Sequence, residues 1–462
     1  MTPRFGTSGL RGLASDLATD LVADHTRAFL ASCPIGGGLF VGQDLRASSP
    51  RIAAAVMDAA TGQGVEVADV GTLPVPALAL AAQSRGWAAI MVTGSHIPAD
   101  RNGLKFYTPS GEITKNDEAA ILAARGLPSK GMAAGRQRDS TVLAAYESRY
   151  LRAFGGQALQ GLRVGIWQHS SAGRDLITDV VARLGARIVT LGRSDSFVAV
   201  DTEAIDAATE TQLARWVAEH GLDALVSADG DGDRPLLVDE TGRIVPGDLL
   251  GLVTSEFLGA SHVVTPISSN TAVELCGLFD VRYTRIGSPH VIAGLNEVAA
   301  AISGARVAGY EPNGGFLLGF EAAAPRGALA PLVTRDSLLP MLSMLAMARE
   351  QRRSVGELVA RLPPRFTARG RLENVPQERA QSFLDKIRQE PAPFLSAMTL
   401  GYESARNEID GLRLMTAGGE IVHLRPSGNA PEFRLYVEAE TASRAKDLLQ
   451  RGLLAVRVAL WG

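Results

Sequence analysis

Helical and strand-like spacings of hydrophobic residues alternate through the first two thirds of the chain. One unit recurs three times: a helix-like segment, a glycine that ends it, an apolar strand, and a polar loop that contains glycine. These units cover residues 78–96, 213–234 and 295–315. In such folds helices cover the faces of a sheet, and ligands bind beyond the carboxyl ends of its strands. The pattern therefore predicts α/β domains with three polar loops at equivalent strand ends.

The residues before the first unit add one helix and one strand. Ser48-Ser49-Pro50 predicts the start of a helix, because a hydroxyl can cap the first turn and proline suits it. We expect this helix to end near Gly62, and residues 65–70 to form a strand.

The last hundred residues have a different pattern. Pro363-Pro364 and the charged residues 367–379 predict a boundary. Beyond it we expect a small α+β domain from about residue 365. Its predicted elements are a helix at 379–389, an antiparallel pair at 409–414 and 420–424, a strand at 433–439 and a helix at 443–454.

Composition narrows the class of protein. The 462 residues are too many for one core and favour three or four domains. With 46% hydrophobic and 21% charged residues and a net charge of −3, neither nucleic acid nor an anionic membrane is an expected partner. Two cysteines, Cys33 and Cys276, do not suggest a disulfide framework. The chain shows no signal-peptide pattern and no long apolar run. We expect a soluble cytoplasmic protein, monomeric or a small homo-oligomer.

The loop of the second unit carries the most specific chemistry. Asp229, Asp231 and Asp233 alternate with two glycines, and Arg234 follows them. Carboxylates crowded this closely need a cation, and hard oxygen ligands suit Mg²⁺. A plain Asp-Gly hairpin turn is the simpler alternative, but it needs only one aspartate. A calcium EF-hand is excluded because its sixth loop position, a required glycine, is Arg234. The loop predicts a divalent-metal site, which suggests phosphate chemistry.

Three further segments offer groups for an anionic, hydroxylated substrate. In the first loop Ser95, next to His96 and near Lys105, is placed as a nucleophile or phosphoryl carrier. In the third loop Glu311 and Asn313 suit the hydroxyl pairs of a sugar. Each could also be an ordinary polar turn. The fourth segment, which could be a surface turn as well, predicts an anion cradle formed by Arg425, Ser427, Gly428, Asn429 and, beyond them, Arg434.

These segments, in this order, resemble the α-D-phosphohexomutase superfamily, the four-domain phosphomannomutase and phosphoglucomutase enzymes. The resemblance spans nearly the whole chain, and its strength lies in the order of motifs that are individually weak. Besides the loops above, it includes Gly6-Thr7-Ser8-Gly9-Leu10-Arg11-Gly12, Gly42-Gln43-Asp44-Leu45-Arg46 and Asn102-Gly103-Leu104-Lys105.

The resemblance implies three similar mixed α/β sandwich domains followed by a smaller α+β C-terminal domain, arranged around a central cleft. The implied limits are 1–142 for a phosphoserine-bearing domain and 143–247 for a metal-binding domain. Residues 248–364 would form a sugar-binding domain, and residues 365–462 a phosphate-binding domain.

The resemblance also implies residue roles. Ser95 would carry the phosphoryl group and, with the three aspartates, hold Mg²⁺. Lys105 and His96 are general base and acid candidates, and Arg11 and Arg234 would add positive charge. The substrate-binding residues implied are Glu311, Asn313, Arg285, Arg425, Ser427, Gly428, Asn429 and Arg434.

Several positions depart from the family pattern. The serine loop reads Thr-Gly-Ser-His-Ile-Pro where many relatives carry Thr-Ala-Ser-His-Asn-Pro, so Gly94 and Ile97 differ. Asn313 stands where serine is frequent, and Asn429 where threonine is common. Residues 287–290 differ from the more usual Val-Gly-His, which leaves His290 without a defined role.

The expected activity is that of a phosphohexomutase, and of a phosphomannomutase first. It would interconvert hexose 6-phosphate and hexose 1-phosphate through phosphoserine and a hexose 1,6-bisphosphate, which would also act as activator. Phosphoglucomutase or dual activity is the close alternative, and phosphoglucosamine mutase a further one. A sugar-phosphate-binding protein without catalysis and a phosphatase are the alternatives from other classes.

Overall fold

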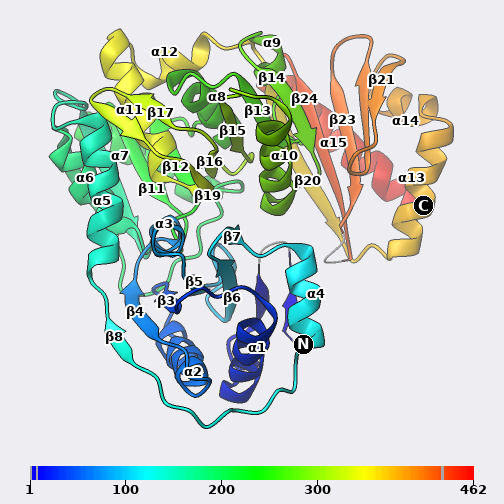
Figure 1. Ribbon diagram of the computed structural model, residues 1–462. Helices are drawn as coiled ribbons and strands as arrows, with labels where there is room; N and C mark the ends of the chain where they lie inside the picture. Colours follow the sequence, from blue (N-terminus) through cyan, green and yellow to red (C-terminus); the bar gives the residue numbers. More distant parts are fainter. Residues whose placement is uncertain (1–2, 7–8, 428–430, 462) are drawn as a thin grey trace. The chain divides into compact units, whose positions relative to one another are not determined.

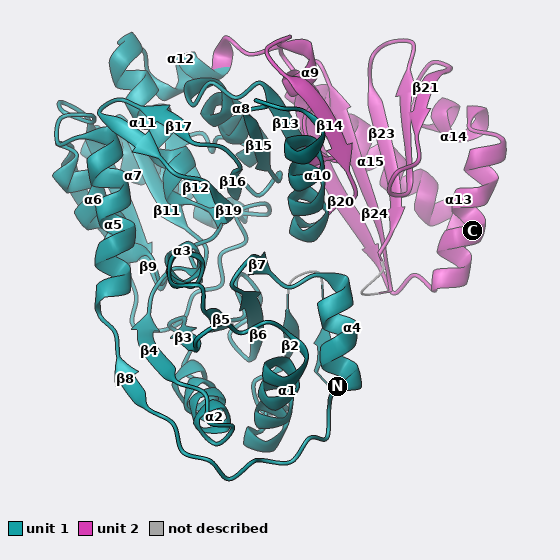
Figure 2. Cartoon of the chain, viewed as in Figure 1, with its two compact units in different colours: residues 1–264, 287–359 teal, residues 265–286, 360–462 magenta. Residues whose placement is uncertain are grey.

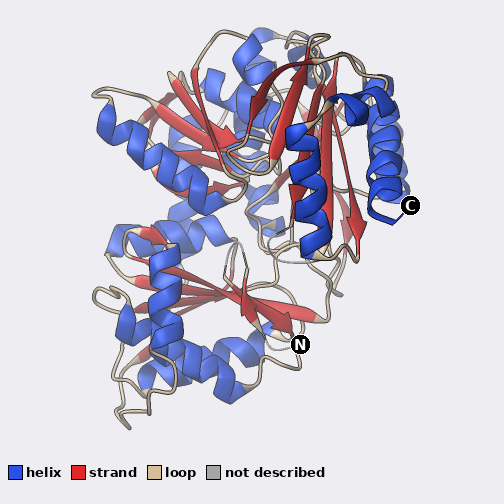
Figure 3. Ribbon diagram, turned by 90° about the vertical axis from the view of Figure 1, so that its right-hand side faces the viewer, coloured by secondary structure: helices blue, strands red, loops and turns tan. Residues whose placement is uncertain are grey.

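The computed structural model describes residues 3–6, 9–427 and 431–461. It divides the chain into two compact units, shown in separate colours in Figure 2. Unit 1 comprises residues 1–264 and 287–359, and unit 2 comprises residues 265–286 and 360–462. In Figure 3 the strands of the sheets, in red, are accompanied by helices, in blue. Each unit is described by itself.

The first sheet of unit 1 is mixed. Its strands are β1 (Arg4–Phe5), β2 (Leu10–Leu13), β3 (Leu39–Gln43), β4 (Val67–Thr72), β5 (Ala88–Val92), β6 (Arg101–Thr108), β7 (Gly111–Glu112) and β8 (Arg136–Arg138). They pair in the order β1-β2-β6-β5-β3-β4-β8, with β7 on β6. The helices of this region are α1 (Thr19–Ser32), α2 (Ser49–Thr61), α3 (Val75–Arg85) and α4 (Lys115–Ala123). Helices α1 and α2 lie on one face and α3 on the other (Figure 1), so β5 is buried along its whole length.

The second sheet holds the aspartate loop. Its strands are β9 (Arg163–His169), β10 (Arg187–Arg193), β11 (Ala224–Ala228) and β12 (Pro235–Asp239), in the order β10-β9-β11-β12. The helices are α5 (Thr141–Phe154), α6 (Arg174–Arg183) and α7 (Ala207–His220). Because β11 and β12 are antiparallel and Ala228 pairs with Pro235, residues 229–234 form the connection of a hairpin.

The third sheet of unit 1 has the strand order β13-β15-β16-β19. These strands are β13 (His262–Pro266), β15 (Val307–Tyr310), β16 (Phe316–Leu318) and β19 (Leu332–Asp336), and a separate hairpin is formed by β17 (Ala322–Ala324) and β18 (Gly327–Leu329). The helices are α8 (Gly247–Phe257), α10 (Ser288–Ala301), α11 (Leu338–Gln351) and α12 (Val355–Ala360). Helix α11 is buried from Leu338 to Ala348, which explains why its sequence is apolar on every face.

Unit 2 is built on one antiparallel sheet with the strand order β20-β24-β23-β22-β21. Its strands are β20 (Phe366–Glu373), β21 (Glu403–Asn407), β22 (Leu412–Thr416), β23 (Ile421–Pro426) and β24 (Glu432–Ala439), and unit 2 also holds β14 (Asp280–Thr284). The helices are α9 (Ala272–Leu275), α13 (Gln377–Gln389), α14 (Ala392–Ala397) and α15 (Ala442–Trp461). A core of its own includes Phe383, Leu424 and Leu448.

The predicted repeat is confirmed in all three places. Helix α3 ends at Gly86 and α7 at Gly221, and both glycines have a positive φ (65° and 54°) that glycine adopts without strain. After α10 the chain turns at Gly304, with a φ of 75°, and enters β15. The strands β5, β11 and β15 then lead into the three polar loops.

Helix α2 begins where it was predicted, but two local details differ from the predictions. Ser48 precedes α2, but its side chain does not cap the helix. Its hydroxyl accepts a hydrogen bond from Asn102 Nδ2 (2.8 Å) instead, because the start of β6 lies against this end of the helix. Residues 367–373, for which no strand was predicted, belong to β20, which pairs with β24 over its full length. Within the described part of the chain, no helix has the length and apolar composition needed to cross a membrane.

Candidate active site

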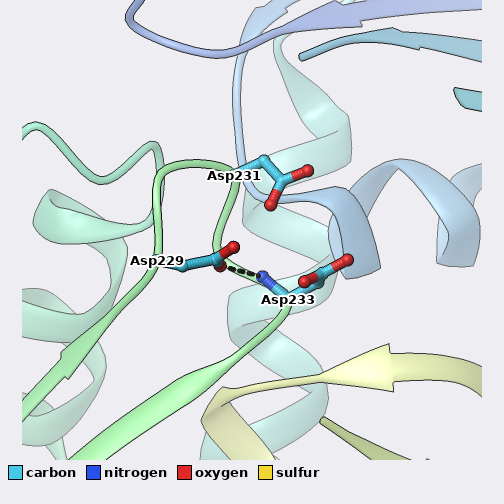
Figure 4. A group of neighbouring side chains, drawn as sticks. All are labelled: Asp229, Asp231 and Asp233. Atoms are coloured by element: carbon cyan, nitrogen blue, oxygen red, sulfur yellow. Dashed lines mark hydrogen bonds between the residues drawn. The ribbon is translucent and has the colours of Figure 1, made fainter. Parts of the chain in front are cut away.

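The aspartate loop is a buried turn that points three carboxylates toward one another. Asp229, Asp231 and Asp233 are each fully shielded from solvent, and one oxygen from each lies within 4.8 Å of the others (Figure 4). The turn is closed by Asp229 Oδ1, which accepts hydrogen bonds from the main-chain N–H groups of Asp233 (3.1 Å) and Arg234 (3.2 Å). Gly232, with a φ of +70°, supplies the left-handed residue that the turn needs.

The donor set of this turn fits a hard divalent cation. Asp231 Oδ1 and Asp233 Oδ1 are buried and have no hydrogen-bond partner among the described residues. Burial, together with the charges of Asp231 and Asp233, raises the pKa of Asp229 well above its usual value. Burial also opposes ionisation of Asp233, but Arg335, Lys105 and Arg234 hold its pKa below the usual range. Oxygen-only ligands of this charge are those that Mg²⁺ prefers.

The serine loop lies directly against the aspartates. Ser95 is 1% exposed, and its Oγ donates a hydrogen bond to Asp229 Oδ2 (2.6 Å). His96 Nδ1 lies 3.4 Å from the same Oγ. The main chain at Ser95 has a φ of 52°, a left-handed conformation that a non-glycine residue adopts only when its surroundings enforce it. The fold thus joins two loops 134 residues apart through one hydroxyl.

Arg46 is the residue that enforces this loop conformation. Its guanidinium is buried, is paired with Asp44 (Nε to Oδ2, 3.1 Å), and donates to four main-chain carbonyls. These carbonyls belong to Ser95 (2.8 Å), Ile97 (2.6 Å), Pro98 (2.5 Å) and Arg101 (2.9 Å). The motif at residues 42–46 did not by itself predict a role for Asp44 or Arg46. The signal that the sequence offers is a pair of opposite charges just before a predicted helix.

Basic groups surround the carboxylates. Lys105 Nζ lies 2.7 Å from Asp231 Oδ2 and 2.6 Å from Asp233 Oδ2. Burial, together with the neighbouring Arg234 and Arg335, lowers the pKa of Arg11 to about 10. Burial and the charges of Arg234 and Arg11 lower the pKa of His96 to about 2, so this imidazole is neutral at ordinary pH. The predicted residues of unit 1 are therefore brought together around the aspartates.

The third loop is held by its own main chain. Glu311 and Asn313 are 5% and 6% exposed, and Asn313 Oδ1 accepts a hydrogen bond from Gly315 N (3.0 Å). Burial raises the pKa of Glu311, although Arg335 and Arg234 act in the opposite direction. A buried carboxylate and amide side by side can accept from and donate to hydroxyl groups.

The tripeptide Arg335-Asp336-Ser337, which joins the end of β19 to α11, was not predicted as functional. Arg335 is paired with Asp233 (Nη2 to Oδ2, 2.8 Å) and with Glu311 (Nη1 to Oε2, 3.5 Å), so it joins the aspartate loop to the third loop. Ser337 Oγ donates to the carbonyl of Gly232 (2.7 Å). No local motif marks this segment, because its partners lie on distant parts of the sequence.

The predicted anion cradle belongs to unit 2. Arg425 in β23 lies directly opposite Arg434 in β24, and its Nε donates to Asp410 Oδ1 (2.7 Å). Arg285 Nε donates to the carbonyl of Ile409 (3.1 Å), which is next to Asp410. Ser427 is 2% exposed. Gly428 and Asn429 lie outside the described residues, as do Thr7 and Ser8 of the N-terminal motif.

Comparison with known proteins agrees with this arrangement. The sequence matches the four phosphoglucomutase/phosphomannomutase domain families: α/β/α domains I, II and III over residues 2–125, 148–242 and 247–366, and the C-terminal domain over 369–453. It is 44% identical to a phosphomannomutase from Sinorhizobium fredii, with 98% of each chain covered. It is 39% identical to a phosphomannomutase from Salmonella muenchen, with 98% of this chain and 95% of that protein covered.

A solved structure shares the fold. It is a phosphoglucomutase/phosphomannomutase family protein from Burkholderia thailandensis, with a TM-score of 0.78, 20% identity, and 99% of this chain and 98% of that chain covered. All four domain families match in order, and the relatives at 44% and 39% identity align over nearly their whole length. The chain belongs to the phosphoglucomutase/phosphomannomutase family of the α-D-phosphohexomutase superfamily.

Proposed function

We propose that this phosphohexomutase is a phosphomannomutase that interconverts mannose 6-phosphate and mannose 1-phosphate. The observation that carries the proposal is the 2.6 Å hydrogen bond from Ser95 Oγ to Asp229 Oδ2, at the edge of a buried carboxylate cluster. A hydroxyl in this place can carry a phosphoryl group beside a bound cation. The two relatives described above are named phosphomannomutases, which favours mannose among the hexoses.

In the proposed reaction, a phosphoryl group passes from Ser95 to the free hydroxyl of a hexose phosphate. The bond between phosphorus and Ser95 Oγ breaks, a bond to the sugar oxygen forms, and the product is a hexose 1,6-bisphosphate. The bisphosphate then returns its other phosphoryl group to Ser95. Mg²⁺, held by Asp229, Asp231 and Asp233 with the phosphate of Ser95, would neutralise charge on the transferred group.

The remaining residues of unit 1 position substrate and protons. Lys105 Nζ and the imidazole of His96 are the groups we assign to moving the proton of the sugar hydroxyl, since Lys105 borders the carboxylates and His96 borders Ser95. Arg11 and Arg234 add positive charge where phosphoryl oxygens would lie. Glu311 and Asn313 would bind the sugar hydroxyls.

In unit 2, Arg425, Ser427 and Arg434 would bind the phosphate that is not transferred, together with Gly428, Asn429 and Arg285. Arginine suits this task because its planar fork binds phosphate with two parallel hydrogen bonds. The proposal includes domain limits at 1–142, 143–247, 248–364 and 365–462, the first of which falls within α5. It also includes a cytoplasmic location, a monomeric or small homo-oligomeric state, no nucleic-acid partner, and activation by hexose 1,6-bisphosphate.

The test is turnover measured by ³¹P NMR. Purified protein with Mg²⁺ and a catalytic amount of hexose 1,6-bisphosphate is given mannose 1-phosphate, glucose 1-phosphate or glucosamine 1-phosphate. We expect the fastest conversion with mannose 1-phosphate and little free phosphate. Preference for glucose or glucosamine 1-phosphate would assign the chain to those mutases, and release of free phosphate would make it a phosphatase.

The role of Ser95 is tested with a matched pair of variants. S95A should abolish turnover and the phosphorylated peptide in mass spectrometry, because Ser95 Oγ is the hydroxyl that donates to the Asp229 carboxylate. The control is S110A, at an exposed serine of a β-turn, which should keep both. Full turnover by S95A would refute the phosphoserine mechanism, and binding of sugar phosphate without turnover by the unaltered protein would indicate a binding protein.

A further inference from the structure

Unit 1 contains a cavity that the proposed reaction does not use. Its volume is about 470 Å³, and it lies between α3, α5 and the end of the β17–β18 hairpin. Helices α3 and α5 pack against each other, and α5 also contacts β18. Among the described residues that line the cavity, none belongs to the three loops of the candidate active site. The cavity is large enough for an organic molecule of the size of a nucleotide.

The charge of the lining favours an anion. The lining contains three arginines, Arg85, Arg149 and Arg152, and one carboxylate, Asp139, so its net charge is +2. Asp139 is paired with Arg85 (Oδ2 to Nη1, 3.3 Å) and also accepts hydrogen bonds from Thr141. The positive charges of Arg149 and Arg152 are therefore not balanced by a carboxylate of the lining.

Arg149 supplies a buried donor that lacks an acceptor. Only 9% of the residue is exposed, and its Nη2 donates to the carbonyl of Ala330 (2.5 Å). Its Nε is buried and has no hydrogen-bond partner within the described part of the chain. A buried N–H group without an acceptor is unfavourable, and a guanidinium binds an oxyanion through paired N–H groups. An anion in the cavity would offer paired acceptors to the Arg149 guanidinium, whose charge no carboxylate of the lining balances.

The other part of the lining is apolar. Phe40, Leu80, Val142 and several alanines form it, and the ring of Phe40 packs at 5.3 Å from that of Trp87. The guanidinium of Arg85 lies 5.1 Å from the centroid of the Phe40 ring, so the aromatic surface and the charged surface adjoin. A ligand with an anionic end and an aromatic or aliphatic body matches both surfaces.

One wall of the cavity is connected to the aspartate loop. Helix α5 carries Arg149 and also Tyr146 and Tyr150, whose hydroxyls both donate to Asp336 (2.7 Å from Tyr146). The neighbours of Asp336 are the residues that hold the loop: Arg335 pairs with Asp233, and Ser337 bonds to the loop carbonyl at Gly232. A displacement of α5 would therefore be transmitted to the aspartate loop through one buried carboxylate.

We propose that this cavity binds an amphipathic organic anion, and that its occupant modulates turnover through α5 and Asp336. The binding half stands on the cavity alone. The modulation half rests on the proposed mutase function.

The test uses 1-naphthalenesulfonate as probe. This molecule combines a negatively charged sulfonate with an aromatic ring system, and it cannot be a substrate. Binding to the full chain is measured by isothermal titration calorimetry in the unaltered protein and in R152A, R149Q and R215A. Arg152 and Arg215 are both exposed, so their loss does not threaten folding, and Arg215 lies on α7 outside the lining. R149Q keeps a side-chain donor near Ala330.

We expect one strong site whose affinity falls at least about tenfold in R152A and R149Q and is unchanged in R215A. No binding at millimolar probe, or equal affinity in R152A and the unaltered protein, would overturn the binding half. In the mutase assay, saturating probe should change kcat at least about twofold in the unaltered protein and R215A. Binding without any change in kcat would overturn the modulation half. Absence of mutase activity before probe is added would be a failure of the proposed function and not of the cavity site.

Discussion

Replacing Arg46 by lysine should loosen the serine loop and lower turnover. The guanidinium makes five hydrogen bonds: one to Asp44 and four to the carbonyls of residues 95, 97, 98 and 101. A lysine ammonium has three donors. At least two buried acceptors therefore lose their partner in R46K, and each costs about 1–3 kcal/mol. The free energy that stabilises the loop conformation is expected to fall by roughly 2–6 kcal/mol, which is a large part of the stability of a typical domain.

The loss of stability is measured in the serine loop itself. Hydrogen exchange followed by mass spectrometry reports local opening in a peptide that covers residues 93–103. An opening free energy lower by about 2 kcal/mol raises the exchange rate about thirtyfold. The matched control is R27K, because Arg27 Nε makes a single hydrogen bond, to the carbonyl of Leu127, near the surface. Its effect on stability should stay within about 0.5 kcal/mol.

The mutase assay completes this prediction. We expect R46K to lower kcat more than KM, since Ser95 would lose the enforced φ of 52° that directs its hydroxyl to Asp229. R46K with loop exchange within about threefold of the unaltered protein, and with normal kcat, would refute the view that this guanidinium fixes the serine loop.

Three further predictions concern other parts of the chain. G94A should lower the free energy of unfolding, measured in urea, by about 1–3 kcal/mol, because the added Cβ would lie 2.6 Å from Cζ of the firmly held Arg46. An unchanged unfolding midpoint would contradict this. Mg²⁺ at a hundred times its dissociation constant should raise the free energy of unfolding by about 2.7 kcal/mol, and chelation should reverse this. In D231N the free energy of unfolding should not change with Mg²⁺, and an equal change would place the metal elsewhere. Burial lowers the pKa of His423 to about 4, so the free energy of unfolding should be highest above pH 6.5 and fall by about 3 kcal/mol as the pH drops from 6.5 to 4. H423Q should flatten this dependence of stability on pH, and an equal dependence in both proteins would exclude His423 as its cause.

The repeated units and the chemistry of their loops can be predicted from the order of residues alone. The positions of Gly86, Gly221 and Gly304, each followed by an apolar strand, were sufficient to predict where β5, β11 and β15 begin. These signals are local: a left-handed glycine and a run of apolar residues act on the neighbouring main chain whatever the rest of the fold does. The alternation of aspartate and glycine at 229–233 is local in the same sense, and it is sufficient to indicate the carboxylate cluster.

The groups that hold these loops in place depend on contacts between distant parts of the chain. Ser48 was expected to cap α2, yet its hydroxyl accepts from Asn102, because a partner 54 residues away competes with the helix end. Residues 367–373 looked like a charged boundary, but pairing with β24 makes them a strand, since an exposed strand face tolerates charge.

The cations that pair with the buried carboxylates come from positions far away in the sequence. Lys105 meets Asp233 across 128 residues, and Arg335 joins Asp233 to Glu311. Such ion pairs form because burial makes an uncompensated charge costly, so the fold brings each buried carboxylate a buried cation. Residue type alone indicates that these aspartates need a positive partner, whereas the packing of three sheets determines which lysine and which arginine supply it.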